Sequence, residues 1–219
     1  MSAAALFAYA AGFSYAYLTL GAGTGALILF GVVQATIIGW AVTRGDRLHG
    51  RAWLGLLLAV GGLIYLVGPG VSAPDPLGAA LMALAGLAWA VYTLRGRGSS
   101  QPVLTTTANF LYSVPFAVLL LVIVLAAGAA SMDGVGLALA IASGAIASGL
   151  GYVLWYTALP HLSRTTAGIV QLTPAPLAAL GGLLLVGEAI TARLVIASLL
   201  ILGGVALAIT PRAMSGKAT

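Results

Sequence analysis

Cysteine is absent from this chain of 219 residues, and charged residues make up only 6% of it. The lack of cysteine excludes disulfide bonds, thiolate metal ligands and cysteine nucleophiles. A water-soluble domain carries about 25% charged residues, so this chain has too few of them to cover a surface that faces water. Together the two shortages exclude a disulfide-stabilised secreted domain and a soluble catalytic domain.

Hydrophobic residues, in contrast, make up 61% of the chain, and its mean hydropathy is +1.12. This composition is typical of an integral membrane protein that lies almost wholly within the bilayer. We therefore interpret the net charge of +5 as basic loops that set the topology, and not as a surface for nucleic acid. The first residues lack the basic start of a signal peptide, so we expect them to stay in the protein as a spanning helix.

Charged and turn-forming residues divide the sequence into eight apolar segments. Each is near the roughly 20 residues that a helix needs to cross a bilayer. The sequence therefore predicts an all-α, polytopic membrane helix bundle with eight transmembrane helices. The predicted spans are 3–20, 24–43, 52–68, 77–94, 103–128, 134–158, 165–187 and 194–210.

The basic residues are distributed unequally between the two sides of this bundle. When successive connectors are placed on alternate sides, eight of the nine Lys and Arg residues fall on one side and Arg193 falls on the other. The positive-inside rule makes the basic side cytoplasmic. An even number of spans then places both termini in the cytoplasm, and we expect a multi-pass protein of the cell (inner) membrane. The eight residues are Arg44, Arg47, Arg51, Arg95, Arg97, Arg164, Arg212 and Lys217.

An internal repeat relates the two ends of the chain. A shift of 142 residues lays 24–69 over 166–211 without a gap, and the matches fall on glycine, proline and charged residues. The two copies lie five helices apart, so they cross the membrane in opposite senses. Inverted repeats are typical of secondary transporters, whose substrate site lies near the bilayer midplane. The matched residues include Gly39 with Gly181, Arg51 with Arg193, Gly61 and Gly62 with Gly203 and Gly204, and Pro69 with Pro211.

The repeat predicts how the chain is organised. A partial first repeat of three helices occupies 1–70, a linker occupies 71–76, a complete second repeat of five helices occupies 77–211, and a cytoplasmic tail occupies 212–219. The first repeat lacks counterparts of the first two helices of the second. We therefore expect a ten-helix protein without its first two helices, and a true eight-helix form is the alternative.

The sequence of residues 156–208, which includes YTALPHLSRTTAGIVQLTPAPLAALGG, resembles the end of an EamA-type transporter of the drug/metabolite transporter superfamily. The shared features are an aromatic helix end, a mid-helix proline, a Gly-Glu pair and a closing helix with a Gly-Gly pair. This resemblance implies ten helices in two inverted repeats. It also implies export or exchange of amino acids or other small metabolites. One departure is Val32 in the first copy, where the second copy has Pro174.

Polar interruptions of the apolar spans are the candidate substrate-binding residues. Gln171 and Pro174 lie where a proline opens a helix, and freed carbonyls in a membrane are tolerated beside protein or a water-filled cavity. The functional interpretation is a hinge with a polar site on the transport pathway, and the alternative is a packing kink. Asn109 and Gln34 are each predicted to contact substrate, and an interhelical hydrogen bond is the alternative for both. Tyr112 shares a helix face with Asn109.

Aromatic residues supply the remaining candidates. Ser148 and Tyr152 recur four residues apart, on one helix face, where they are predicted to line a cavity for an apolar or aromatic substrate. An aromatic belt at the membrane interface is the alternative for this region. Tyr15, Trp89 and Tyr92 are also candidates, for which packing or belt positions are the alternative.

The positions of the ionisable residues bear on how transport is driven. None lies at the centre of a span, which favours a facilitator or exchanger over a proton-driven antiporter, unless the missing helices supply such a group. No set of residues fits an intramembrane enzyme, a metal site or a cofactor site. Glu188 and Arg193 are predicted to cap helices and set topology. The expected partners are the lipid bilayer and a small-molecule substrate, with homodimer formation left open. A truncated, non-transporting membrane fragment or a structural membrane subunit is the alternative function.

Overall fold

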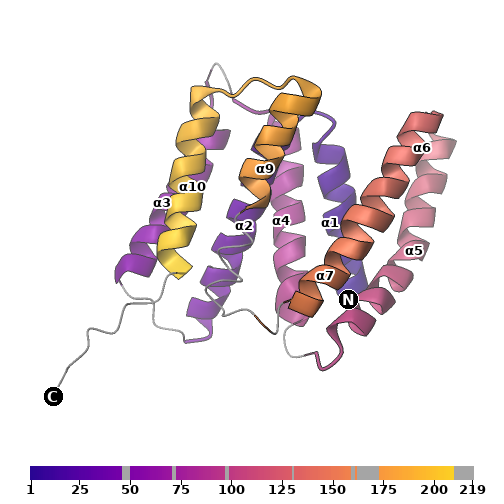
Figure 1. Cartoon of the computed structure of the whole chain (residues 1–219), viewed down its shortest axis with the longest axis horizontal. Coiled ribbons are helices and arrows are strands. Elements are labelled where there is room, and N and C mark those ends of the chain that lie inside the picture. The colour runs from indigo at the N-terminus through magenta and orange to yellow at the C-terminus, as the bar shows by residue number, and fades with distance from the viewer. Residues whose placement is uncertain are drawn as a thin grey trace. The chain divides into compact units, whose positions relative to one another are not determined.

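The computed structural model describes residues 1–45, 50–70, 73–96, 99–129, 131–158, 161 and 173–209. Every regular element in these residues is a helix (Figure 1). The elements are α1 (Ser2–Ala16), α2 (Ala22–Thr43), α3 (Gly50–Val67), α4 (Pro76–Gly96), α5 (Pro102–Ala126), α6 (Gly134–Ile141), η1 (Ala142–Leu150), α7 (Gly151–Ala158), α9 (Pro174–Gly181), η3 (Gly182–Val186) and α10 (Ala192–Ile209).

The all-helical, polytopic membrane fold that the sequence predicts is confirmed. Each predicted span contains a helix in its described residues, although 165–172 of the span 165–187 lie outside them. Six helices in the described residues are long and apolar enough to cross a membrane. Two predicted spans coincide with shorter helices, α1 with 15 residues and the apolar stretch Pro174–Val186. The structure therefore supports a multi-span bundle, and the count of eight spans stays a prediction.

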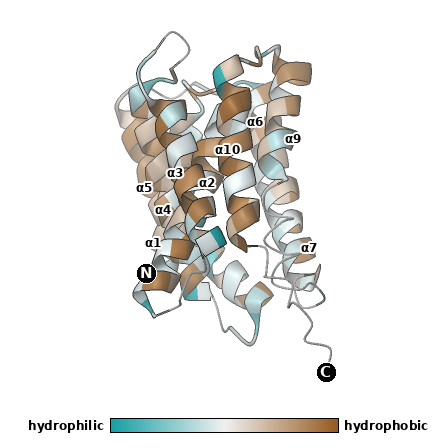
Figure 2. Cartoon of the chain, turned by 90° about the vertical axis from the view of Figure 1, so that its left-hand side faces the viewer, coloured by the Kyte–Doolittle hydropathy of each residue, from teal (hydrophilic) through white to brown (hydrophobic). Residues whose placement is uncertain are grey.

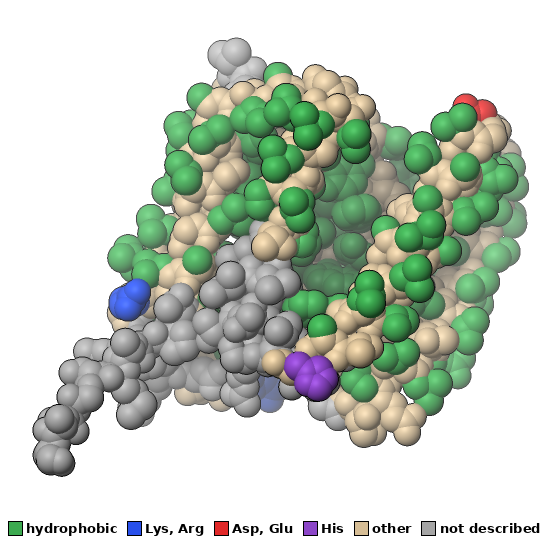
Figure 3. Space-filling model, in the orientation of Figure 1, with side chains coloured by type: hydrophobic (Ala, Val, Ile, Leu, Met, Phe, Trp, Pro, Cys, Tyr) green, Lys and Arg blue, Asp and Glu red, His purple; other side chains and the backbone are tan. Residues whose placement is uncertain are grey.

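Apolar side chains cover the surfaces that the helices present outward. Figure 2 shows hydrophobic residues along most of the helices, with the strongly hydrophilic residues mainly near helix ends and in loops. In Figure 3, apolar side chains cover the visible faces of α6, α9 and α10. The described residues of α5 place Leu111, Leu119 and Leu121 at more than half exposure. A hydrocarbon solvent accounts for this pattern, since such surfaces are rare on water-soluble proteins.

The chain forms two compact units, and α1 and α4 each pass from one unit to the other. The first unit comprises residues 1–8 and 91–163, and the second comprises residues 9–90 and 164–219. The hydrophobic core of the second unit gathers buried residues of α2, α4, α9 and α10, together with the C-terminal ends of α1 and α3.

In the second unit, α3 and α10 pack against each other with their backbones in close approach. A Cβ atom added to Gly55 would meet the backbone of Gly204 and Ala208, and one added to Gly204 would lie 2.7 Å from the nitrogen of Ala59. Glycine is required at these positions because any side chain would separate the helices. Gly62, one end of this contact, faces Ile201. Residues later in α3 contact residues earlier in α10, so the two helices are antiparallel.

The buried positions of α3 and α10 follow the register of the sequence repeat. Four of the five buried residues of α3 fall on buried residues of α10 when 142 is added to their numbers. The Gly-Gly pairs agree as well: the second glycine of each pair lies in the interface, and the first has nothing within 4 Å of an added Cβ atom. Antiparallel packing in equivalent registers is what an inverted repeat predicts. The four matches are Ala52 with Leu194, Gly55 with Ala197, Ala59 with Ile201, and Gly62 with Gly204.

Charged residues stabilise one end of the second unit. The carboxylate of Glu188 accepts the backbone N–H of Ala22, at 2.8 and 2.9 Å to its two oxygens. The guanidinium of Arg193 donates to the carbonyls of Gly68, at 2.6 Å, and Pro69, at 3.1 Å. Each charge has the sign that suits the helix end it meets, because the start of α2 is positive and the end of α3 is negative. The predicted capping role is therefore confirmed for both residues.

In the first unit, α5 runs beside the continuous segment of α6, η1 and α7 (Figure 1). Asp133 begins this segment by accepting the N–H of Gly136 at 2.6 Å, an N-cap that satisfies a free amide. The middle of the segment, ASGAIASGL, is a π-helix, and Gly151 still donates its N–H to the carbonyl of Ile146, five residues earlier. Such wide turns are rare and often lie at functional sites.

Candidate functional site

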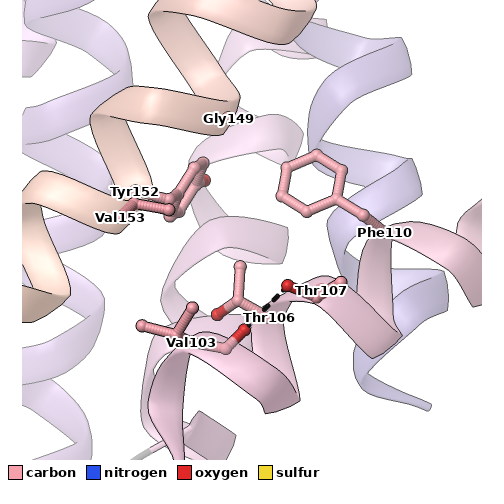
Figure 4. Close-up of a pocket in the computed structure, with 7 residues that line it drawn as sticks. All are labelled: Val103, Thr106, Thr107, Phe110, Gly149, Tyr152 and Val153. Atoms are coloured by element: carbon pink, nitrogen blue, oxygen red, sulfur yellow. Dashed lines mark hydrogen bonds between the residues drawn. The ribbon is translucent and has the colours of Figure 1, made fainter.

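The first cavity of the first unit lies between α5 and α7, and we call it the α5–α7 pocket. Its volume is about 150 Å³. Helix α5 supplies most of the lining, and η1 and α7 supply the opposite wall (Figure 4). The lining residues are Val103, Thr106, Thr107, Phe110, Gly149, Tyr152 and Val153.

Two aromatic rings face each other across this pocket. The rings of Phe110 and Tyr152 meet edge to face, with their centroids 5.6 Å apart and their planes at 76°. Figure 4 shows these rings above the side chains of Val103, Thr106 and Thr107. The hydroxyl of Thr107 donates to the carbonyl of Val103 at 3.0 Å. A cavity of about 150 Å³ lined by apolar groups has room for one benzene-sized group, so this pocket suits an apolar or aromatic moiety.

A buried hydrogen bond ties the pocket to α4. The hydroxyl of Tyr92 donates to the Oγ1 atom of Thr106 at 3.2 Å. Both residues are buried, and buried polar groups are costly unless they are paired. The bond therefore fixes the rotation of α5 relative to the last turns of α4, and with it the direction in which the pocket residues point.

The second cavity of this unit shares Thr106 with the α5–α7 pocket, and we call it the Arg95 cavity. Its main part has a volume of about 440 Å³, and a polar recess of about 30 Å³ adjoins it. Ser2, Arg95 and Asn109 line both parts. The main part is completed by Met1, Ala3, Ala4, Tyr112 and Phe116, and the recess by Tyr92, Gly96, Ser99, Pro102, Thr105 and Thr106.

The polar side chains of the Arg95 cavity are hydroxyls, one amide and the guanidinium of Arg95, which can only donate. The Nε atom of Arg95 donates to the hydroxyl of Ser2 at 3.1 Å. The half-buried amide of Asn109 makes no hydrogen bond with any residue that the structure describes. Among the described residues that line these two cavities, Arg95 alone has a charged side chain. A carboxylate is the group that an arginine and an amide bind best together.

The acidic side chains that the structure describes bind backbone amides at helix starts. Asp75 accepts the N–H of Gly78 at 2.6 Å, and Asp133 and Glu188 accept helix-start amides as described above. Asp46 lies outside the described residues. None of these three side chains lines the α5–α7 pocket or the Arg95 cavity, and the positive charge of Arg95 there favours anionic groups.

The structure brings several sequence-predicted site residues together. Tyr92, Asn109 and Tyr112 line the Arg95 cavity or its recess, and Tyr152 lines the α5–α7 pocket. Ser148 lies in η1, one residue before Gly149, and is not a lining residue. These residues all belong to the first unit.

The remaining candidates belong to the second unit. Gln34 lies in α2 with 6% of its surface exposed, and Tyr15 is 42% exposed. The ring of Trp89 packs on Tyr9 with centroids 4.7 Å apart. Pro174 begins α9, a position where its missing N–H costs nothing. Gln171 lies outside the described residues.

Sequence reasoning missed three residues that define the cavities: Arg95, Thr106 and Phe110. Arg95 was counted among the loop charges, although it belongs to the last turn of α4. Threonine and phenylalanine are common in spanning helices, and nothing in the sequence sets these two apart. Their spacing of four residues places them on one face of α5 with Val103, the signal that was available.

The comparisons with known proteins agree with this architecture. The EamA-like transporter family matches residues 76–210. The chain belongs to the EamA-like transporter family. This family is part of the drug/metabolite transporter superfamily, so the resemblance seen in the sequence is confirmed and the chain is a multi-pass membrane protein of a transporter type. Membership does not favour the alternative of a non-transporting fragment, and the family is one of transporters.

Two individual proteins are similar to this EamA-like chain. An uncharacterized protein of Pseudomonas aeruginosa strain PAO1, PA1977, is 55% identical over 210 residues, which cover 96% of this chain and 72% of that protein. A solved protein crystal structure superposes with a TM-score of 0.60 at 21% identity, covering 94% of this chain and 73% of that one. The second likeness shows a shared fold.

Proposed function

We propose that this protein exports or exchanges amino acids or related apolar and aromatic solutes across the cell (inner) membrane. The observation that carries the proposal is the pair of cavities on α5, one cationic and one aromatic, in a chain of a transporter family. An amino acid has the matching parts: a carboxylate for Arg95 and Asn109, and a side chain for a pocket between Phe110 and Tyr152.

The mechanism we propose is alternating access between two inverted repeats. The equivalent registers of α3 and α10, and their antiparallel packing, support this arrangement. In such proteins one repeat rocks against the other around a fixed site. Gln34, Tyr15, Trp89, Ser148 and the Gln171–Pro174 segment are proposed as further contacts on the pathway. Both termini are proposed to lie in the cytoplasm, as the distribution of basic residues indicates.

Exchange or facilitated diffusion fits this site better than proton coupling. A proton-driven carrier usually holds an ionisable group within its spans. The three acidic residues that the structure describes lie outside the helices, and each accepts a backbone amide at the start of a helix. A bound solute is then expected to move down its own gradient, or against a second solute.

The test is solute exchange in proteoliposomes. Purified protein is reconstituted, loaded with one unlabelled amino acid at a time, and given a trace of the same labelled solute outside. We expect Asn109→Leu and Tyr152→Ala to lower the exchange rate at least tenfold, which corresponds to loss of about 1.4 kcal/mol of binding. Leu111→Ala, on the lipid-facing side of α5, is the control with an unchanged rate. Exchange that is equal in all four proteins, or absent from the parent for every solute in the panel, contradicts the proposal.

A further inference from the structure

The α5–α7 pocket offers little to a water molecule, although two threonines line it. The hydroxyl of Thr107 donates to the carbonyl of Val103 at 3.0 Å, and the Oγ1 atom of Thr106 accepts the hydroxyl of Tyr92 at 3.2 Å. Both threonines therefore already bind groups of the protein. A buried water molecule typically makes about two to four hydrogen bonds, so the pocket suits an apolar group better than water.

Gly149 belongs to the wall of this pocket that faces α5 (Figure 4). It lies in η1, on the helix face that also presents Tyr152 and Val153, because residues three and four positions apart are neighbours on a helix. Beyond the adjoining turn of its own helix, a Cβ atom added to Gly149 would meet one described atom within 4 Å, the carbonyl oxygen of Gly144 at 3.6 Å. This is an ordinary contact distance, so a methyl group fits there without strain.

The backbone does not require glycine at position 149. Its φ lies outside the left-handed region, in which Gly187 is found. It also differs from Gly55 and Gly204, whose added Cβ atoms would meet the backbone of the facing helix. Alanine forms helices better than glycine does. The effect of this glycine is therefore on the pocket, where a methyl group would take roughly 30 Å³, the volume of one water molecule, from about 150 Å³.

We propose that Gly149 sets the size of the α5–α7 pocket, and that the pocket binds one six-membered aromatic ring of the transported solute. This inference rests on the proposed function and names the side chain of its substrate. A dry cavity of about 150 Å³ binds benzene, whereas an indole carries a second fused ring and exceeds this volume. The bound ring packs beside Phe110 and Tyr152, because aromatic rings attract each other in edge-to-face and offset arrangements.

Thr106 connects this pocket with the proposed carboxylate site. It lines both the α5–α7 pocket and the recess of the Arg95 cavity. A ring and a carboxylate that are joined by a short linker, as in phenylalanine, therefore suit the two cavities together. Valine carries the same carboxylate with a smaller side chain, and tryptophan carries it with a larger one, so the three amino acids form a matched series.

The chain offers a matched pair of variants for the size of the pocket. Gly149→Ala adds a methyl group to the pocket wall. Gly144→Ala adds the same group to the same π-helix, at a position that does not line the pocket and where an added Cβ atom meets nothing within 4 Å. Any general effect of alanine on η1 is therefore common to both variants.

The first test needs no transport. Because the chain has no cysteine, Thr107→Cys places a single thiol in the pocket. Two methanethiosulfonate reagents, one that transfers a benzylthio group and one that transfers a methylthio group, are compared by their rates of modification. One methylene in an apolar pocket changes discrimination by about tenfold or more, so we expect Gly149→Ala to lower the ratio of the benzyl rate to the methyl rate about tenfold. Gly144→Ala should leave this ratio unchanged. A ratio that Gly149→Ala does not change, or that both variants lower equally, overturns the inference.

The second test is exchange in proteoliposomes. We expect the parent protein to exchange phenylalanine faster than tryptophan, and Gly149→Ala to lower the exchange of phenylalanine about tenfold relative to that of valine. Gly144→Ala should keep the parent ratio. Tryptophan exchange as fast as phenylalanine exchange in the parent contradicts the limit to one ring. A parent that exchanges no solute contradicts the proposed function, and the ratio of reagent rates then decides the role of Gly149 by itself.

Discussion

The substitution Gly204→Ala tests the interface between α3 and α10. An added Cβ atom would lie 2.7 Å from the backbone nitrogen of Ala59 and 3.0 Å from the Cβ atom of Leu58. These atoms belong to a helix backbone or to its first side-chain atom, so they move only if the helices separate. Overpacking of this kind costs typically 1–3 kcal/mol, and replacement of a helical glycine by alanine returns about 1 kcal/mol. With the upper value for a rigid neighbour, the net loss is about 2 kcal/mol.

Gly203→Ala is the matched control, because an added Cβ atom there meets nothing within 4 Å. Thermal unfolding of the purified protein in detergent should show a Tm lower by roughly 4–8 °C for Gly204→Ala, and a Tm that is unchanged or slightly higher for Gly203→Ala. The equivalent pair in the first repeat, Gly62→Ala and Gly61→Ala, should behave in the same way. If the two members of a pair have equal Tm values, the proposed register of α3 on α10 is refuted.

Two further predictions concern the ends of the helices. Reporter fusions at Lys217 and beside Asp133 should report opposite sides of the membrane, with Lys217 in the cytoplasm, because the basic residues lie on that side; reporters on the same side contradict the inverted topology. Asp133→Ala should lower the free energy of unfolding by about 1 kcal/mol, since it removes the N-cap of α6, whereas Asp133→Asn should retain most of it; an unchanged free energy for Asp133→Ala, measured by denaturant unfolding in detergent, would show that the cap contributes nothing.

Hydropathy predicted the helices well, and glycine spacing predicted the repeat that the buried positions of α3 and α10 follow. Long apolar runs bounded by charge leave few alternatives to a spanning helix. The Gly-Gly pairs at 61–62 and 203–204 were used only as repeat matches, although a glycine in a membrane helix often marks a place where another backbone approaches. The structure places the second glycine of each pair at that contact.

Contacts that depend on three-dimensional packing were not predictable in the same way. The charge of Glu188 indicated a cap, yet its partner is the amide of Ala22 in the other repeat, and a backbone amide has no sequence signal. The π-helix η1 reads in the sequence as an ordinary apolar helix of small residues. The pocket residues Thr106 and Phe110 are inconspicuous for the same reason: their role comes from facing Tyr152, and only the packing of α5 against α7 sets this.

The most direct test of a solute pathway along α5 is solute protection of a thiol at Asn109. In the chain, which has no cysteine, Asn109→Cys places a thiol in the Arg95 cavity, and Leu111→Cys places one on the lipid-facing side of the same helix. A small water-soluble thiol reagent should modify the first and spare the second, because a thiol in hydrocarbon does not ionise. An amino acid that the protein exchanges should slow the modification of the first severalfold. Equal modification of both thiols, or modification of Asn109→Cys that no exchanged solute slows, would contradict a solute pathway through this cavity.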